Sequence, residues 1–156
     1  MSEIALAVGS LAPDVAFELA DGSRSTLAAY RGKPLIVYFY PKDDTPGCTN
    51  EAKAFSDLMP EFDSAGVRVL GVSKDSVKSH AKFIAKYDLK VALAADTEGR
   101  LCEAFGTWVE KAMYGRAYMG IERSTFLIDA EGRIIQIWRK VKVPGHAQLV
   151  LAAAAV

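Results

Sequence analysis

Cysteine and histidine are scarce in this chain, whose 156 residues include only two of each. The two cysteines, Cys48 and Cys102, are too few for a disulfide scaffold and are not spaced as a C-x-x-C or zinc-binding pair. Excess charge is also lacking, because 19 basic residues balance 19 acidic ones. This balance argues against nucleic acid or an anionic membrane as a partner.

Long apolar runs are missing as well. No segment approaches the roughly 20 apolar residues of a membrane span, and residues 1–9 lack a basic leader. The sequence therefore predicts a cytoplasmic protein that does not contact a membrane. About half of the residues are hydrophobic (51%), and no linker, repeat or low-complexity tract divides them, so we expect one domain with one sizeable core over residues 1–156.

Short apolar runs alternate with segments of helical period, which is the pattern of an α/β domain with helices flanking a central sheet. Asp21-Gly22 favours a tight turn between residues 16–19 and 24–27, so we expect an N-terminal β-hairpin. Further strands are predicted at residues 35–40, 67–72, 91–94, 124–128 and 134–138. Helices are predicted from about residue 48, at 76–87, around 101–105 and after Gly145. Pro60 should kink or end the first helix, and the apolar face of the second consists of Val77, Ala81, Ile84 and Ala85.

Cys48 lies between a strand-ending loop and the start of a helix. The first turn of a helix presents unpaired N–H groups and the positive end of its dipole, and both stabilise a thiolate. A buried structural cysteine is the more common role of a free thiol. However, Cys48 is flanked by polar and turn-forming residues and follows the carboxyl end of a strand, where open α/β sheets place their ligands. We therefore interpret Cys48 as a reactive residue.

The loop around Cys48 resembles the signature of a known family. Pro41-x-x-x-Thr45-x-x-Cys48 is similar to the active-site loop of peroxiredoxins, and Gly47-Cys48-Thr49 with Glu51 resembles their bacterioferritin comigratory protein (Q-type) branch. The likeness extends over most of the chain, through Gly71-Val72-Ser73 and Gly120-Ile121-Glu122-Arg123-Ser124-Thr125-Phe126.

The resemblance implies a thioredoxin-like fold with an N-terminal extension and an antioxidant peroxidase that serves cell redox homeostasis without a cofactor or metal. The implied catalytic residues are Pro41, Thr45, Cys48 and Arg123, with Glu51 steadying Arg123. Thiolate attack on a peroxide places negative charge on the departing oxygen, which fixed donors such as Arg123 and the Thr45 hydroxyl would stabilise. Pro41 would shield the thiolate from water. The Thr45 hydroxyl has a competing role as a helix cap.

The sequence departs from many relatives because it carries no second cysteine at the usual positions. Lys53 stands five residues after Cys48, and Ile84 stands near the other expected position, in the segment 76–87. Cys102 lies on an apolar helical face, so burial is its expected role. We therefore expect a one-cysteine enzyme whose sulfenic acid is reduced by an external thiol, whether thioredoxin, glutaredoxin or a small thiol. A monomer or weak dimer is the expected assembly.

Four other interpretations fit the sequence less well. A thioredoxin-like disulfide oxidoreductase needs C-x-x-C, which Cys48-Thr49-Asn50-Glu51 does not provide. A Cys–His hydrolase needs a histidine partner, but surface and capping roles are expected for His80 and His146. A metal site would require these histidines and both cysteines to converge from four distant segments. The non-enzymatic alternative is a thioredoxin-fold binding or chaperone module with an incidental cysteine.

Overall fold

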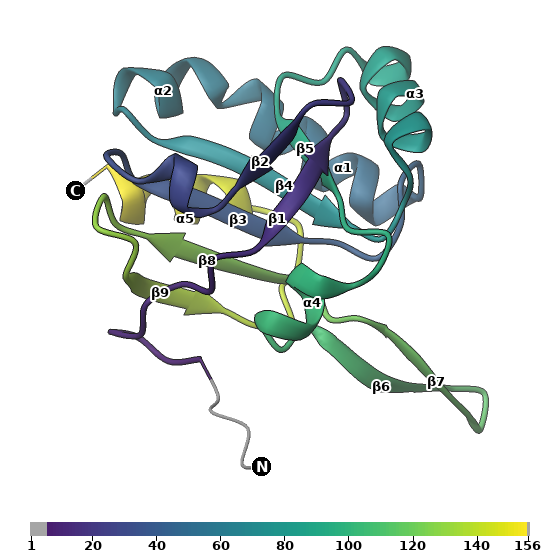
Figure 1. Cartoon of the computed structure of the whole chain (residues 1–156). Coiled ribbons are helices and arrows are strands. Elements are labelled where there is room, and N and C mark those ends of the chain that lie inside the picture. The colour runs from purple at the N-terminus through teal and green to yellow at the C-terminus, as the bar shows by residue number, and fades with distance from the viewer. Residues whose placement is uncertain (1–5, 156) are drawn as a thin grey trace.

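The computed structural model describes residues 6–155. The prediction that residues 1–9 lack a basic leader falls in part on residues 1–5, which lie outside the described residues, as does residue 156. A seven-stranded mixed sheet forms the centre, in the order β2-β1-β5-β4-β3-β8-β9 (Figure 1). Its strands are β1 Ala16–Leu19, β2 Arg24–Thr26, β3 Leu35–Phe39, β4 Arg68–Ser73, β5 Ala92–Ala95, β8 Ser124–Ile128 and β9 Ile134–Trp138.

Parallel pairing is confined to the middle of the sheet, where β4 lies between β3 and β5. The remaining pairs are antiparallel, including the predicted N-terminal hairpin of β1 and β2. The predicted α/β class and mixed central sheet are therefore confirmed. The helices are η1 Ala28–Tyr30, α1 Pro46–Asp57, α2 Met59–Ser64, α3 Val77–Tyr87, α4 Arg100–Ala104 and α5 His146–Ala154.

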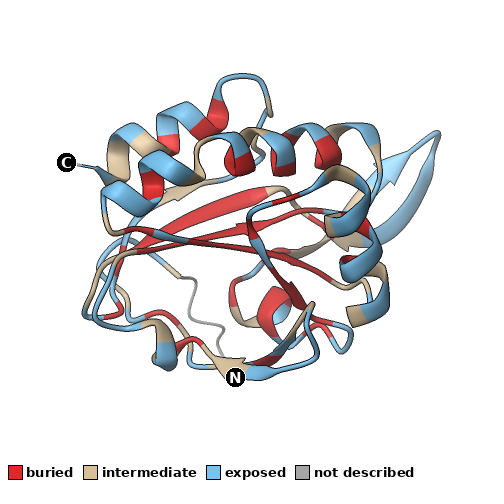
Figure 2. Cartoon of the chain, turned by 90° about the horizontal axis from the view of Figure 1, so that it is seen from above, coloured by how far each residue is buried: buried red, intermediate tan, exposed pale blue. Residues whose placement is uncertain are grey.

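The sheet is buried on both faces. Every residue of β3 is buried, and because alternate side chains point to opposite faces of a sheet, Ile36 and Tyr38 join one core while Val37 and Phe39 join the other. Side chains of α1, α2, α3 and α5 pack in the first core, and those of α4 and the N-terminal segments pack in the second. Figure 2 shows the resulting buried central layer between two covered faces.

The apolar face predicted for α3 is wrong in part. Ala81 and Ala85 are exposed, whereas the buried residues of this helix are His80 and Phe83. A polar residue at the centre of the buried face hides the helical pattern from an analysis that counts apolar residues. Pro60 acts as predicted, because α1 ends at Asp57 and α2 begins at Met59 with the proline in its first turn, where no N–H is needed.

A second hairpin was missed. Strands β6 Trp108–Met113 and β7 Arg116–Ile121 form a separate two-stranded sheet that projects from the molecule (Figure 1). Its turn is Tyr114-Gly115, and both residues have positive φ, of 52° and 76°. Such a turn usually carries Asn-Gly or Asp-Gly, so the sequence gives only a weak signal. Within residues 6–155, no helix combines the length and apolar character required to cross a bilayer.

Candidate active site

Cys48 lies in the first turn of α1. Thr45 is the N-cap residue, and Pro46 begins the helix with a φ angle that proline already favours. This geometry places the sulfur at the positive end of a 12-residue helix. The Cys48 side chain is nevertheless buried, with 2% of the residue exposed. A reactant must therefore be small at its reacting end to reach the sulfur.

Arg123 lies beside this sulfur although 75 residues separate the two in sequence. The arginine stands between β7 and β8, and its Nη2 donates a hydrogen bond to Cys48 Sγ at 3.3 Å. Burial lowers the pKa of Arg123, but the charges of Glu51 and Cys48 outweigh burial and raise it overall. The guanidinium therefore presents a fixed positive charge to the sulfur.

Glu51 holds the other side of the same guanidinium. Arg123 Nη1 donates to Glu51 Oε1 at 2.6 Å, and the glutamate side chain is only 2% exposed. Its second oxygen, Oε2, is buried without a hydrogen-bond partner in the described part of the chain. Burial raises the pKa of Glu51 to about 7, against the opposing effect of Arg123. Glu51 is thus a buried acid that titrates near neutral pH.

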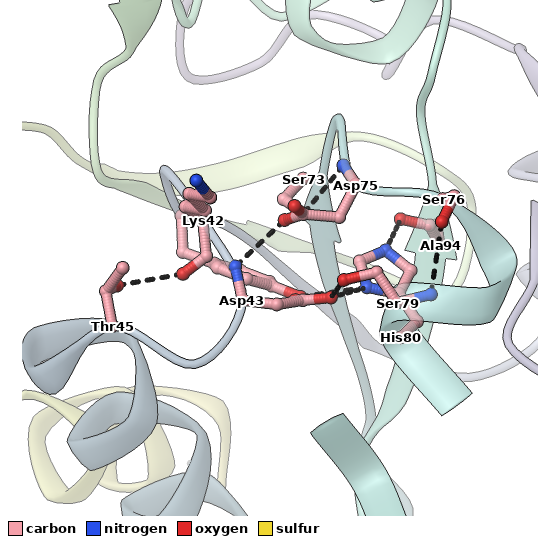
Figure 3. Close-up of polar contacts among 10 residues, drawn as sticks. Lys42, Asp43, Thr45, Ser73, Asp75, Ser76, Ser79, His80 and Ala94 are labelled. Carbon is pink, nitrogen blue, oxygen red and sulfur yellow. Dashed lines mark hydrogen bonds and ion pairs between the residues drawn. The ribbon is translucent and has the colours of Figure 1, made fainter. Parts of the chain in front are cut away.

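Thr45 and Pro41 lie on the loop that leads to Cys48. Thr45 occupies the N-cap position of α1, but its hydroxyl makes no capping bond and donates instead to the Lys42 carbonyl at 2.8 Å (Figure 3). The predicted capping by this hydroxyl is therefore wrong. Pro41 is exposed at the surface. The catalytic roles of Thr45 and Pro41 remain predictions.

Cys102 is buried, as predicted, and lies on the other side of the sheet from Cys48. Cys102 packs in the core that contains Val37 and Phe39, and Cys48 packs in the core of Ile36 and Tyr38. Burial, reinforced by Asp96, raises the pKa of the Cys102 thiol far above its usual range. The central strands therefore separate the Cys102 thiol from the one at the helix start.

Both histidines are buried, so the surface and capping roles predicted for them are wrong. His80 has no exposed surface, and its two ring nitrogens lie 2.7 Å from Asp43 Oδ2 and 2.8 Å from the Ala94 carbonyl (Figure 3). His146 begins α5 as expected, but its Nε2 lies 2.8 Å from the Thr125 hydroxyl inside the core. A single histidine in a helical segment does not indicate which distant residue it bonds, so the sequence did not predict these partners.

One group of side chains has the composition of a metal site. Potential ligand atoms of Asp43, Asp75 and His80 lie within 4.8 Å of one another. The Asp43 carboxylate already contacts His80 and accepts from the hydroxyl groups of Tyr40 and Ser79. The Asp75 carboxylate accepts from the Asp43 N–H and the Ser73 hydroxyl. The arrangement is therefore complete as a hydrogen-bonded network.

Comparison with known proteins places this geometry in a family. The sequence profile of the AhpC/TSA family matches residues 8–137. The chain belongs to the AhpC/TSA family. It is a peroxiredoxin, and peroxiredoxins are thiol-dependent peroxidases that reduce peroxides with electrons from thiols. The predicted family and enzyme class are confirmed.

Relatives of this peroxiredoxin also confirm the predicted branch. It is 51% identical to Peroxiredoxin Bcp of Xanthomonas campestris over 98% of this chain and 96% of that protein. It is 49% identical to Peroxiredoxin Bcp of Bacillus subtilis over 89% and 88% of the two chains. A solved structure of Xanthomonas campestris Peroxiredoxin Q superposes with a TM-score of 0.89 at 52% identity, covering 96% of this chain and 94% of that one. Another structure of the Xanthomonas campestris protein is described in terms of its alkyl peroxide reduction activity.

Proposed function

We propose that this peroxiredoxin reduces hydrogen peroxide and organic hydroperoxides through Cys48, by a one-cysteine cycle. The observation that carries the proposal is the hydrogen bond from Arg123 to the Cys48 sulfur at a helix start. A charged donor and a helix dipole both favour the thiolate, which is the nucleophilic form of cysteine. The alkyl peroxide activity described for the Xanthomonas campestris relative supports organic hydroperoxides as one substrate class.

In the first step the Cys48 thiolate attacks the terminal oxygen of the peroxide. A sulfur–oxygen bond forms as the oxygen–oxygen bond breaks, so that the cysteine becomes a sulfenic acid and the departing alkoxide or hydroxide takes a proton from water. Negative charge grows on the departing oxygen during this step. The Arg123 guanidinium, held by Glu51, and the Thr45 hydroxyl are our proposed donors to the peroxide oxygens. The hydroxyl has a single O–H, so it would turn from the Lys42 carbonyl to the peroxide when the substrate binds. Pro41 would limit the access of water to the sulfur.

In the second step an external thiol attacks the sulfenic acid. Water leaves and a mixed disulfide forms, and a second thiol then releases Cys48 in its reduced form. The placement of the two cysteines on opposite faces of the sheet supports this route over an internal disulfide with Cys102. We infer that the reductant is thioredoxin, glutaredoxin or a small thiol. A monomer or weak dimer in the cytoplasm, with residues 1–156 as one domain, completes the proposal.

Intact-mass analysis tests the assignment of the cysteines. Reduced wild-type, Cys48→Ser and Cys102→Ser proteins are each treated with one equivalent of hydrogen peroxide and a sulfenic-acid trap, then measured without reductant. We expect the trapped adduct in the wild type and in Cys102→Ser but not in Cys48→Ser. Loss of two hydrogens from the wild type, without an adduct, would show an internal disulfide and overturn the one-cysteine cycle.

A further inference from the structure

The loop of residues 41–45, called the catalytic loop below, carries Thr45 and has no regular secondary structure. It leads into α1 and Cys48. One of its side chains, Asp43, is turned inward and is only 7% exposed. The Tyr40 hydroxyl donates to Asp43 Oδ1 at 2.6 Å, and the Ser79 hydroxyl donates to Oδ2 at 2.8 Å. Asp43 therefore joins the catalytic loop to the end of β3 and to helix α3 (Figure 3).

His80 extends this connection across the core. Its Nδ1 lies 2.7 Å from Asp43 Oδ2, and its Nε2 lies 2.8 Å from the Ala94 carbonyl oxygen of β5. A carbonyl oxygen only accepts hydrogen bonds, so Nε2 is the donor to Ala94. The imidazole thus bridges the loop and the sheet from a site with no exposed surface.

The backbone of Asp43 is held as well. Its N–H donates to Asp75 Oδ2 at 2.9 Å, and the same oxygen accepts the Ser73 hydroxyl at 2.6 Å. The next residue, Asp44, pairs with Lys86 and Tyr87 of α3, but Lys86 is 57% exposed, and exposed pairs contribute little. The anchoring of the loop therefore depends on the buried contacts of Asp43.

We propose that Asp43 and His80 are positioning residues of the peroxidase, which hold the catalytic loop so that Cys48 stays beside Arg123. This inference rests on the proposed role of Cys48. Neither residue needs to touch the peroxide, because a displacement of about 1 Å at a reacting centre can lower a rate by roughly 10²-fold. Buried hydrogen bonds are suited to this task because leaving any of their members unpaired is costly.

Two substitutions at the same position separate positioning from charge. In Asp43→Asn, the amide oxygen can accept from Tyr40, and the amide nitrogen can donate to Ser79 Oγ and to Nδ1 of His80 in its Nε2–H tautomer. The anchor is then kept without its negative charge. Asp43→Ala removes the anchor altogether. We expect kcat/KM for hydrogen peroxide to fall about tenfold or more in Asp43→Ala and to stay within about 1.5-fold of the wild type in Asp43→Asn.

Alkylation of Cys48 by iodoacetamide gives an independent measure of loop position. Loss of the anchor should expose the buried sulfur, so that alkylation becomes faster in Asp43→Ala while the reaction with peroxide becomes slower. Urea unfolding of each variant gives the unfolded fraction, and both rates are then corrected to the folded fraction alone. Asp88→Asn is the matched control. Among residues 6–155 the side chain of this exposed aspartate at the end of α3 pairs with Lys90 alone, so the change should alter neither rate.

If Asp43→Ala does not fold, Ser79→Ala replaces it, since this change removes one hydroxyl donor and should lower kcat/KM by about threefold. The proposal is overturned if the anchor-free variant keeps the wild-type peroxide rate in its folded fraction. It is equally overturned if Asp43→Asn loses as much activity as Asp43→Ala, because charge would then be the cause. Failure of the proposed function would be seen separately in the intact-mass analysis, because Cys48→Ser would then still form the sulfenic adduct.

Discussion

Replacing Glu51 with glutamine should change how the stability of this peroxiredoxin depends on pH. The glutamate is buried, one of its oxygens is bound to Arg123 at 2.6 Å, and the other has no partner in the described residues. Glutamine has nearly the same shape, and its amide oxygen can still accept from Arg123. The substitution therefore removes the titration while keeping the contact.

The expected magnitude follows from the pKa of Glu51, which burial raises from 4.5 to about 7 in the folded state. A folded protein with a raised carboxyl pKa binds the proton more tightly than the unfolded chain does. The associated stability is fully present below about pH 4.5 and is lost as the pH rises to about 7. At 1.36 kcal/mol for each pKa unit, the loss amounts to about 3 kcal/mol.

Urea unfolding followed by circular dichroism, at intervals from pH 5 to pH 8 on the reduced protein, measures this effect. The free energy of unfolding of Glu51→Gln minus that of the wild type should increase steadily with pH and level off above about pH 7. Glu131→Gln, at an exposed position between β8 and β9, is the control and should show no comparable increase. A difference that is also flat for Glu51→Gln would refute the titration of this carboxyl near neutral pH.

Three further substitutions test other parts of the structure. Arg123→Lys should lower kcat/KM for hydrogen peroxide by about 10²-fold in a steady-state peroxidase assay. The reason is that an ammonium group lacks the separate nitrogens of a rigid fork that bond the Cys48 sulfur and Glu51. An unchanged value would exclude the guanidinium from the reaction. Cys102→Ser should retain wild-type turnover with every thiol reductant tested, whereas loss of turnover would assign Cys102 a part in the cycle. Gly71→Ala should lower the free energy of unfolding by about 1–3 kcal/mol, because a Cβ there would lie 2.7 Å from Leu93 Cδ2 in a packed core. An unchanged free energy of unfolding would show that the core relaxes to accept the methyl group.

Most of the fold could be predicted from local patterns. The strand at 35–39 and the hairpin around Asp21-Gly22 were visible because apolar runs and turn residues act within a few positions. The β6–β7 hairpin was not visible, because its turn carries an atypical pair, Tyr114-Gly115, at positive φ. The face of α3 was misjudged because the buried position at its centre is a histidine.

The candidate site could be predicted only where a motif named its members. Cys48, Thr45 and Glu51 lie within seven residues and share one loop and helix, so their proximity follows from the chain itself. Arg123 was assigned to the site from the family resemblance alone, because the sequence around a single arginine does not show which distant residue it contacts. Asp43 and His80 were not linked, because 37 residues separate them and each looks ordinary in its own segment.

The sequence by itself determined that Cys48 stands at the start of a helix after a strand, because helix and strand signals are local and the peptide geometry follows from them. Only the tertiary structure decided which distant groups meet that sulfur and which do not. Antiparallel pairing brings β8 beside β3, and Arg123, which directly precedes β8, reaches Cys48 at the start of the helix that follows β3. The same sheet separates Cys102 from it, because side chains that alternate along a strand enter different cores.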